Sequence, residues 1–221
     1  MADPEASIAD YQAMAATIHE ATLRSERLID ALLMLARTDG PVDRAVLDLA
    51  ELAQTTAGPL LELRVASGLR IDRALAPAPV LGDRSLLERL IANLVENAVR
   101  YNSPGGWLSV ETQQRGDEAV LTVANSGDQI EQAEVALLFQ RFYRRDRSRN
   151  RATGGAGLGL SIVDAVVRAH GGTLEARALA GGGLRVTVSL PGVPSKPQAG
   201  DSAPDKRRIK GQLTTPLSGV S

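Results

Sequence analysis

The chain has 221 residues, of which 43% are hydrophobic, enough for one domain with a core and additional segments. Lys and Arg number 25 and Asp and Glu 26, so the formal net charge of −1 argues against a nucleic-acid-binding protein. Without cysteine there is no disulfide, thiol nucleophile or cysteine metal site. The acidic start lacks the apolar region of a signal peptide, and no apolar run is long enough to span a bilayer, so we expect a soluble protein.

Residues 8–37 carry apolar side chains at spacings of three and four, which predicts a long amphipathic helix. Its apolar seam consists of Ile8, Tyr11, Ala15, Ile18, Ile29, Leu32 and Ala36. Such a seam requires one or more partner helices, or else packing on the helix's own domain. Gly40-Pro41 is expected to end the helix.

Periodicity and turn residues predict the remaining elements. The expected helical stretches are 46–66 with an interruption at Gly58-Pro59, 83–101 with Asp83 as N-cap, 131–138, and one from the glycine-rich residues 154–160 to about 169. The expected strands are 69–75, 80–81, a hairpin of 107–113 with 119–124, and a closing hairpin of 174–178 with 184–190 around Gly181–Gly183. Residues 139–156 are expected to form a loop, and residues 192–221 a disordered tail.

Two amide side chains and one guanidinium share a side of the helix expected at 83–101. Asn93 and Asn97 are one turn apart, and Arg100 continues the same stripe. One interpretation is a solvated polar face. The other is a site for metal and phosphate, because an amide oxygen is a hard, neutral ligand for Mg²⁺, which takes few protein ligands and shares the rest with phosphates.

A glycine run opens the helix expected to end near residue 169. Gly155, Gly157 and Gly159 would let backbone N–H groups approach a phosphate, where the helix N-terminus adds partial positive charge. The run alone is weak evidence, since no Gly-Lys-Ser/Thr of a P-loop follows. Six arginines in the preceding loop suit a polyanion, or form an ordinary solvated charge run.

Four motifs in a fixed order are more specific than any one alone. They are Asn93-x-x-x-Asn97, Asn125-Ser126-Gly127, Phe139-x-x-Phe142-Tyr143-Arg144 and Gly155-x-Gly157-Leu158-Gly159-Leu160. Together they resemble the N box, first glycine box, F box and second glycine box of the catalytic ATP-binding domain of sensor histidine kinases. Residues 32–37 look like the end of the second dimerisation helix of such kinases, so the resemblance extends over about residues 5–191.

The resemblance implies an α+β fold, a two-layer α/β sandwich of the histidine kinase ATPase type preceded by a long dimerisation helix. The implied domains are 1–40, the second helix of a dimerisation and phosphotransfer hairpin, and 41–191, the catalytic ATP-binding domain, followed by the tail 192–221.

The resemblance also implies ATP and Mg²⁺ as ligands. Asn93, Asn97 and Glu96 match catalytic positions: Asn97 would hold Mg²⁺, Asn93 would support the phosphates, and the role of Glu96 stays open. Arg100 matches a phosphate-reaching position and Tyr101 a ring beside adenine. The full implied ATP-binding set is Asn93, Asn97, Arg100, Tyr101, Asn125, Gly127, Ile130, Arg144, Gly155, Gly157, Leu158 and Gly159.

The chain departs from the family pattern in the first glycine box, which is usually Asp-x-Gly-x-Gly. Asn125 replaces the Asp and Gln129 the second Gly. The Asp normally accepts a hydrogen bond from the adenine amine, and an Asn oxygen can accept the same bond without charge. We therefore expect a change in nucleotide affinity rather than in nucleotide identity.

A second departure concerns the acceptor histidine. These kinases phosphorylate a His in a box like His-Glu-Leu-Arg-Thr-Pro on the first dimerisation helix, which this chain is expected to lack. His19 begins a partial imitation without the Pro and is expected to be an exposed helical residue. His170 is expected to complement the dipole at a helix C-terminus.

The first interpretation is therefore the ATP-binding subunit of a split two-component histidine kinase. It would phosphorylate a His of a partner protein, act upstream of a response regulator, and form a dimer or hetero-oligomer through the N-terminal helix. A truncated gene product would have the same sequence. The alternatives are a non-catalytic module that docks on kinase dimers, and an anti-sigma-type serine kinase, which the N-terminal helix and F box disfavour. We expect a cytoplasmic location, with membrane association only through a partner.

Overall fold

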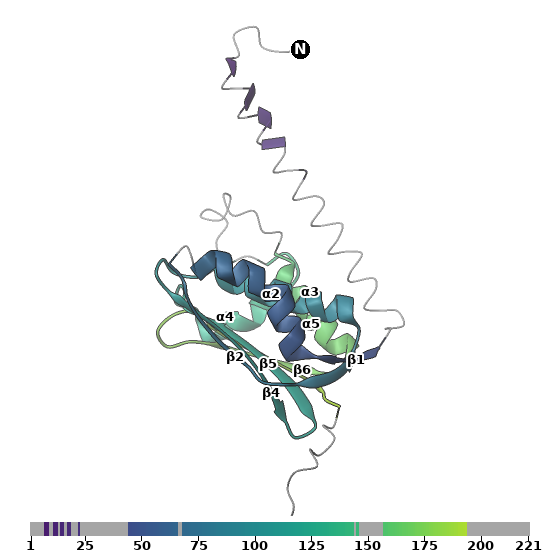
Figure 1. Cartoon of the computed structure of the whole chain (residues 1–221). Coiled ribbons are helices and arrows are strands. Elements are labelled where there is room, and N and C mark those ends of the chain that lie inside the picture. The colour runs from purple at the N-terminus through teal and green to yellow at the C-terminus, as the bar shows by residue number, and fades with distance from the viewer. Residues whose placement is uncertain are drawn as a thin grey trace, which may run out of the picture.

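The computed structural model describes residues 7–8, 11–12, 14–15, 17–18, 22, 44–65, 68–143, 145 and 157–193. The helices are α2 (Leu49–Val65), α3 (Arg84–Arg100), α4 (Gln132–Val135), the 3-10 helix η1 (Ala136–Phe139) and α5 (Gly159–Ala169). The strands are β1 (Ala45–Asp48), β2 (Arg70–Leu75), β3 (Pro79–Gly82), β4 (Trp107–Arg115), β5 (Glu118–Asn125), β6 (Thr173–Ala178) and β7 (Leu184–Pro191). Helices α2, α3 and α5 lie side by side over one face of a five-stranded sheet (Figure 1).

The large sheet has the strand order β2-β4-β5-β7-β6. Only β2 and β4 pair in parallel, and the other neighbours are antiparallel. A separate two-stranded ribbon joins β1 and β3. A mixed sheet with helices on one face is the predicted two-layer sandwich.

Alternation along the strands assigns the two faces of the sheet. In β7, Leu184, Val186, Val188 and Leu190 are buried in the core, while Arg185 between them is exposed. Val186 lies opposite Val123 of β5, so apolar pairs continue across the strands beneath the helices. The other face carries polar side chains, including the hydroxyls of Thr122 and Thr187, 3.4 Å apart. One apolar face against the helices and one more polar face are typical of a sheet with a single helical layer, although the central strand β5 is buried along nearly its whole length.

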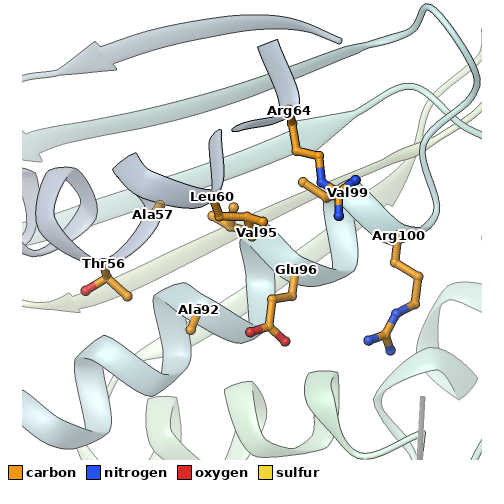
Figure 2. A pocket seen from close by; sticks show the side chains of 9 residues that line it. All are labelled: Thr56, Ala57, Leu60, Arg64, Ala92, Val95, Glu96, Val99 and Arg100. Atoms are coloured by element: carbon orange, nitrogen blue, oxygen red, sulfur yellow. The ribbon is translucent and has the colours of Figure 1, made fainter. Parts of the chain in front are cut away.

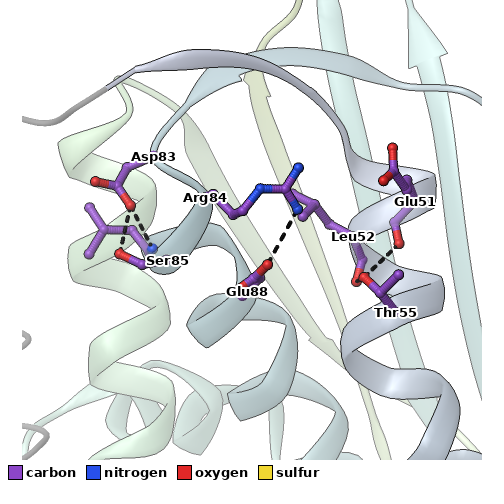
Figure 3. Close-up of polar contacts among 8 residues, drawn as sticks. Glu51, Leu52, Thr55, Asp83, Arg84, Ser85 and Glu88 are labelled. Carbon is purple, nitrogen blue, oxygen red and sulfur yellow. Dashed lines mark hydrogen bonds and ion pairs between the residues drawn. The ribbon is translucent and has the colours of Figure 1, made fainter.

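Helix α3 forms as predicted from its apolar spacing and its N-cap. The Asp83 carboxylate accepts hydrogen bonds from the Leu86 N–H (3.1 Å) and the Ser85 hydroxyl (2.7 Å; Figure 3). The buried side chains of α3 include Leu86, Leu87, Leu90, Ile91, Leu94, Val95 and Ala98. A side-chain cap and a continuous apolar stripe therefore hold this helix in the middle of the layer, between α2 and α5.

Two expectations for residues 45–66 are wrong. Residues Ala45–Asp48 form β1, because β3 offers them a strand partner, and α2 begins only after Asp48. The Asp48 carboxylate accepts hydrogen bonds from the N–H groups of Ala50 and Ala78, each at 2.9 Å, and so ties the start of α2 to the chain before β3. The helix also continues through Gly58-Pro59, since its buried face outweighs the local cost of proline.

The expected N-terminal helix of residues 8–37 lies mostly outside the described residues. Those described between Ile8 and Thr22 have helical backbone, and Ile8, Tyr11, Met14 and Ile18 are exposed. The expected tail lies outside the described residues from position 194 onward. Among the described helices, none combines the length and apolarity that a bilayer crossing requires.

Candidate functional site

The Asn93 side chain of α3 faces the first turn of α5. It is only 9% exposed, and its Nδ2 donates to the Arg89 carbonyl one turn earlier (2.9 Å). A Cβ added to Gly159, the first residue of α5, would stand 3.2 Å from Asn93 Oδ1. Asn93 of the N box and Gly159 of the second glycine box therefore lie next to each other, although the two motifs were predicted separately from the sequence.

The other polar side chains of α3 are arranged around Asn93. At about 100° per residue, Asn97 lies roughly 40° from Asn93 around the helix, Arg100 roughly 20° to the other side, and Glu96 roughly 60°. Asn97 is half-buried, and its side chain makes no hydrogen bond with the described residues, so its amide oxygen is available to a ligand. Glu96 and Arg100 are exposed.

Glu96 and Arg100 also border a groove between α2 and α3, with a volume of about 630 Å³ (Figure 2). The other lining residues are Thr56, Ala57, Leu60, Arg64, Ala92, Val95 and Val99. Figure 2 shows the Glu96 and Arg100 side chains extending to the same side of α3. The polar stripe thus divides: Asn93 faces α5, whereas Glu96 and Arg100 border the groove.

The first glycine box adjoins the end of α3. Asn125 ends β5, is only 5% exposed, and donates from Nδ2 to the Ser126 carbonyl (2.7 Å), which leaves its Oδ1 as an acceptor. A Cβ added to Gly127 would overlap the carbonyl oxygen of Tyr101, the C-cap of α3. Glycine at 127 is therefore what allows the Tyr101 backbone to lie against this box.

A hydrogen-bonded network that the sequence analysis missed holds this junction together. The Ser126 hydroxyl donates to Asn102 Oδ1 (2.7 Å) and accepts from the Trp107 N–H (2.8 Å). The Asn102 Nδ2 donates to the Trp107 carbonyl (2.9 Å). The available sequence signal was the position of Asn102, directly after Tyr101, which ends the helix.

The Gly181–Gly183 turn also contributes to the first glycine box, beyond its predicted role in a hairpin. Gly182 and Gly183 have φ values of +84° and +101°. A Cβ at Gly183 would overlap the Asn125 carbonyl oxygen, and one at Gly182 would overlap the Gly127 carbonyl oxygen. The Gly183 N–H donates to the Asp128 carbonyl (3.0 Å), so two glycine segments pack backbone to backbone.

The F box and the second glycine box meet directly. The Phe142 N–H donates to the Gly157 carbonyl (2.9 Å), and a Cβ at Gly157, whose φ is +72°, would stand 2.9 Å from the Tyr143 carbonyl oxygen. Phe142 itself has a φ of +65° and is 60% exposed. A non-glycine residue in this conformation is uncommon and marks a constrained segment.

The first turn of α5 presents backbone donors beside Asn93. Its first intrahelical bond runs from the Ile162 N–H to the carbonyl of buried Leu158, so the N–H groups of the preceding residues have no partner within the helix. Ile130, another predicted contact, is half-buried against the core. Arg144 and Gly155 lie outside the described residues.

This arrangement suits an anion with a hard cation. Helix N-terminal N–H groups bind phosphate, and neutral amide oxygens suit Mg²⁺. Within the part of the chain that the structure describes, no three His, Cys, Asp or Glu side chains are grouped to hold a metal. A metal here would take amide and phosphate oxygens, and the Oδ1 atoms of Asn93 and Asn97 fit that requirement.

The opposite end of α5 carries His170, which is buried and follows the last helical residue. Its predicted position at a helix C-terminus is confirmed. The predicted interaction with the helix dipole needs a positively charged ring, and the structure does not favour a charged ring. Burial, reinforced by the nearby Arg44, lowers the pKa of His170 despite the raising effects of the Val166 carbonyl and Asp83. The ring Nε2 accepts a hydrogen bond from the Asp83 N–H (3.0 Å), so the ring is neutral.

Residues 82–194 match the family described as histidine kinase-, DNA gyrase B-, and HSP90-like ATPase. The sensor protein CutS of Streptomyces coelicolor is 40% identical over 193 residues, which cover 86% of this chain and 46% of that protein. The signal transduction histidine-protein kinase BaeS of Escherichia coli is 38% identical over 169 residues, covering 75% and 36%. The chain thus spans less than half the length of these relatives.

Solved structures have the same fold. The mycobacterial sensor histidine kinase MprB superposes with a TM-score of 0.60 at 30% identity, over 69% of this chain and 99% of that one. Full-length ShkA, solved in complex with AMPPNP, superposes with a TM-score of 0.65 at 22% identity, over 81% of this chain and 38% of that one.

Proposed function

This chain belongs to the histidine kinase-, DNA gyrase B-, and HSP90-like ATPase family, and on that premise we propose that it binds Mg-ATP and transfers the γ-phosphoryl group to a histidine of a partner protein. The observation that carries the proposal is the approach of Asn93 Oδ1 to the first residue of α5, Gly159. A neutral oxygen ligand and a phosphate-binding helix terminus then converge on one point.

Adenine binding is assigned to the first glycine box and the end of α3. Asn125 Oδ1 accepts from the adenine amine, because its Nδ2 is already engaged by the Ser126 carbonyl. The exposed ring of Tyr101 flanks the base, and Gly127 and Ile130 line the base on the side of the core. The network through Asn102 keeps these groups together.

Phosphate binding is assigned to the first turn of α5 and the polar stripe of α3. Backbone N–H groups from Gly157 to Gly159 donate to phosphate oxygens, and Arg100 supplies a mobile positive charge. Asn97 is the Mg²⁺ ligand, with Asn93 beside it. When bound, Mg²⁺ supplies charge neutralisation at the phosphates. Arg144 and Gly155 are assigned to the same phosphates, as their motifs imply, and the role of Glu96 stays open.

The acceptor histidine is assigned to a partner. The sequence holds two histidines, and His170 is unsuited because it is buried and hydrogen-bonded at both ring nitrogens. It also lies about 16 Å of helix axis from Gly159. His19, on the segment proposed as a dimerisation helix, lies outside the described residues. The partner would pair with the apolar seam of that segment and pass the phosphoryl group to a response regulator.

Incubation with radiolabelled ATP tests this proposal. The chain alone, the chain mixed with a candidate partner that carries a His-Glu-x-x-x-Pro box, and the His19→Gln variant are compared for acid-labile label. We expect label on the partner and none on the chain alone. Acid-labile label on the chain alone that disappears in His19→Gln would make His19 the acceptor.

The departures at Asn125 and Gln129 favour a second function, a non-catalytic module that docks on kinase dimers. The two functions differ in nucleotide binding. A titration with Mg-ATP that shows no binding, together with association of the chain with a kinase dimer, would support the docking module over the kinase subunit.

A further inference from the structure

His170 joins the C-terminal end of α5 to the N-terminal end of α3. Its ring is 3% exposed, its Nδ1–H donates to the Val166 carbonyl (2.8 Å), and its Nε2 accepts from the Asp83 N–H (3.0 Å). Both ring nitrogens are therefore used inside the protein, one within α5 and the other across to α3. None of the roles proposed above for the nucleotide uses this residue.

The bond to Asp83 completes the cap of α3. In a capping box, the N-cap side chain accepts from the N3 backbone, while a Glu or Gln at N3 accepts in return from the N-cap N–H. The Asp83 carboxylate makes the first of these bonds, accepting from the Leu86 N–H. The N3 residue is Leu86, a buried apolar side chain that accepts nothing. His170 supplies the missing acceptor from 87 positions further along the chain.

The same two helices also contact each other at the candidate site. Asp83 and Asn93 are about 15 Å apart along α3, and His170 and Gly159 are about 16 Å apart along α5. The start of α3 meets the end of α5 at Asp83–His170, and Asn93 further along α3 meets the start of α5 at Gly159. The two helices therefore run antiparallel, with nearly equal lengths between the two contacts. Together with the apolar contacts between the two helices, the first contact therefore contributes to the register of the second.

The His170 ring is closely packed against its neighbours. A Cβ added to Gly82 would stand 2.8 Å from His170 Cδ2 and 2.9 Å from its Nε2, so only glycine leaves room for the ring. The Arg44 guanidinium donates to the Ala169 carbonyl (3.0 Å) and fastens the same end of α5.

We propose that His170, as the neutral Nδ1–H tautomer, is a positioning residue for nucleotide binding: it completes the cap of α3 and so holds Asn93 in register with the phosphate-binding turn of α5. The inference rests on the proposed Mg-ATP function. His170 touches no substrate and acts only through the two helices that it joins.

The chemistry of the bond makes the register depend on protonation. A proton on Nε2 would set two donors against each other, the ring N–H and the Asp83 N–H, and the bond would be lost. The charged groups that act on the ring are Arg44 before β1 and Asp83 at the start of α3. On α5 itself, Asp164 and Arg168 form an ion pair with each other. Strand β3 contributes only Gly82, which carries no charge.

The direction of the pH effect follows from burial. Since burial lowers the pKa of His170 below its ordinary 6.5, the folded chain binds this proton less readily than the unfolded chain. The stabilising contribution is fully present above about pH 6.5 and is lost as the pH falls through the lowered pKa. Asp83 stays charged in this range, because its hydrogen bonds from Ser85 and Leu86 and the nearby His170 outweigh burial and keep its pKa below 3.8.

Two substitutions of His170 distinguish the loss of the hydrogen-bond acceptor from the loss of the titratable ring. In His170→Gln, an amide oxygen can replace Nε2 as acceptor without titrating, whereas His170→Leu removes the acceptor. Mg-ATP affinity is measured for both variants and the unmodified chain from pH 7.5 to 5.5. Comparison with His170→Gln at each pH cancels the protonation of the nucleotide itself. Arg168→Gln, which changes the charge of α5 without touching the ring, is the control.

At pH 7.5 we expect His170→Leu to bind Mg-ATP roughly two- to tenfold more weakly, the equivalent of one neutral hydrogen bond. His170→Gln should stay within about twofold of the unmodified chain. At low pH the unmodified chain should lose affinity relative to His170→Gln, and Arg168→Gln should follow the unmodified chain. Nuclear magnetic resonance of the full chain should show the Nδ1–H tautomer and an Asp83 amide whose exchange accelerates as His170 titrates.

The outcomes separate the two proposals. An unmodified chain that binds no Mg-ATP at any pH would refute the proposed function. A chain that binds Mg-ATP while His170→Leu binds it equally well, with only a lower unfolding temperature, would show that His170 is merely structural and overturn the positioning role. If His170→Leu does not fold, equal pH profiles for His170→Gln and the unmodified chain would overturn it instead.

Discussion

Replacing Asn125 by aspartate would restore the carboxylate that the first glycine box usually carries. In the structure the Asn125 side chain is 5% exposed, and its Nδ2 donates to the Ser126 carbonyl (2.7 Å). Aspartate has no such donor. The substitution therefore brings a carboxylate against the Ser126 carbonyl oxygen, which should lower the stability of the nucleotide-free chain. It also makes the acceptor for the adenine amine stronger, which should raise the affinity for ATP.

The magnitudes follow from the two hydrogen bonds. A bond to a charged group contributes about 1.5–3 kcal/mol and a neutral one about 0.5–1.5, so the adenine bond should gain about 1 kcal/mol, or roughly fivefold in affinity. Loss of the bond to Ser126 should cost the nucleotide-free chain about 1–3 kcal/mol. For a domain of this size that cost lowers the unfolding temperature by roughly 2–4 °C per kcal/mol.

Calorimetric titration with Mg-ATP and thermal unfolding without nucleotide measure the two effects separately. We expect Asn125→Asp to bind ATP several-fold more tightly and to unfold at a lower temperature. Asp128→Asn, an exposed charge change in the same loop, is the control and should alter neither quantity by much. Weaker ATP binding by Asn125→Asp would refute the reasoning, since it would mean that the pocket is adapted to the amide.

Asn97→Ala should abolish most of the Mg²⁺ dependence of ATP binding, because it removes the proposed side-chain ligand; titration with and without Mg²⁺ checks this, and an unchanged dependence would disprove the assignment. Arg84→Ala, exposed on the first turn of the same helix, is its control. Gly183→Ala should destabilise the fold by about 2 kcal/mol or more, since a side chain there would overlap the Asn125 carbonyl at an unfavourable φ. Gly181→Ala, with open space around it, should unfold nearly as the unmodified chain does; equal unfolding temperatures for the two variants would contradict the packing argument.

The elements that the sequence predicted well are those whose signals are local. Helix α3 has its cap residue and its apolar stripe within its own length, and the strands of both hairpins alternate between turn residues. Strand β1 was missed because four apolar-rich residues suit either a strand or a helix, and only the pairing with β3 decides between them. Asp48, followed three residues later by Glu51, was a capping-box signal for the later helix start.

The spacing of residues in the sequence determined that Asn93 and Asn97 share a side of α3, and that glycines stand at the start of α5. Tertiary packing alone decided which atoms meet: Asn93 Oδ1 with the start of α5, the Asn125 carbonyl with Gly183, and the His170 ring with the Asp83 N–H. Periodicity reports which face of an element is apolar, but it carries no information on the partner of a given polar atom. That partner depends on the register in which separate helices and strands pack, and the buried core sets this register collectively.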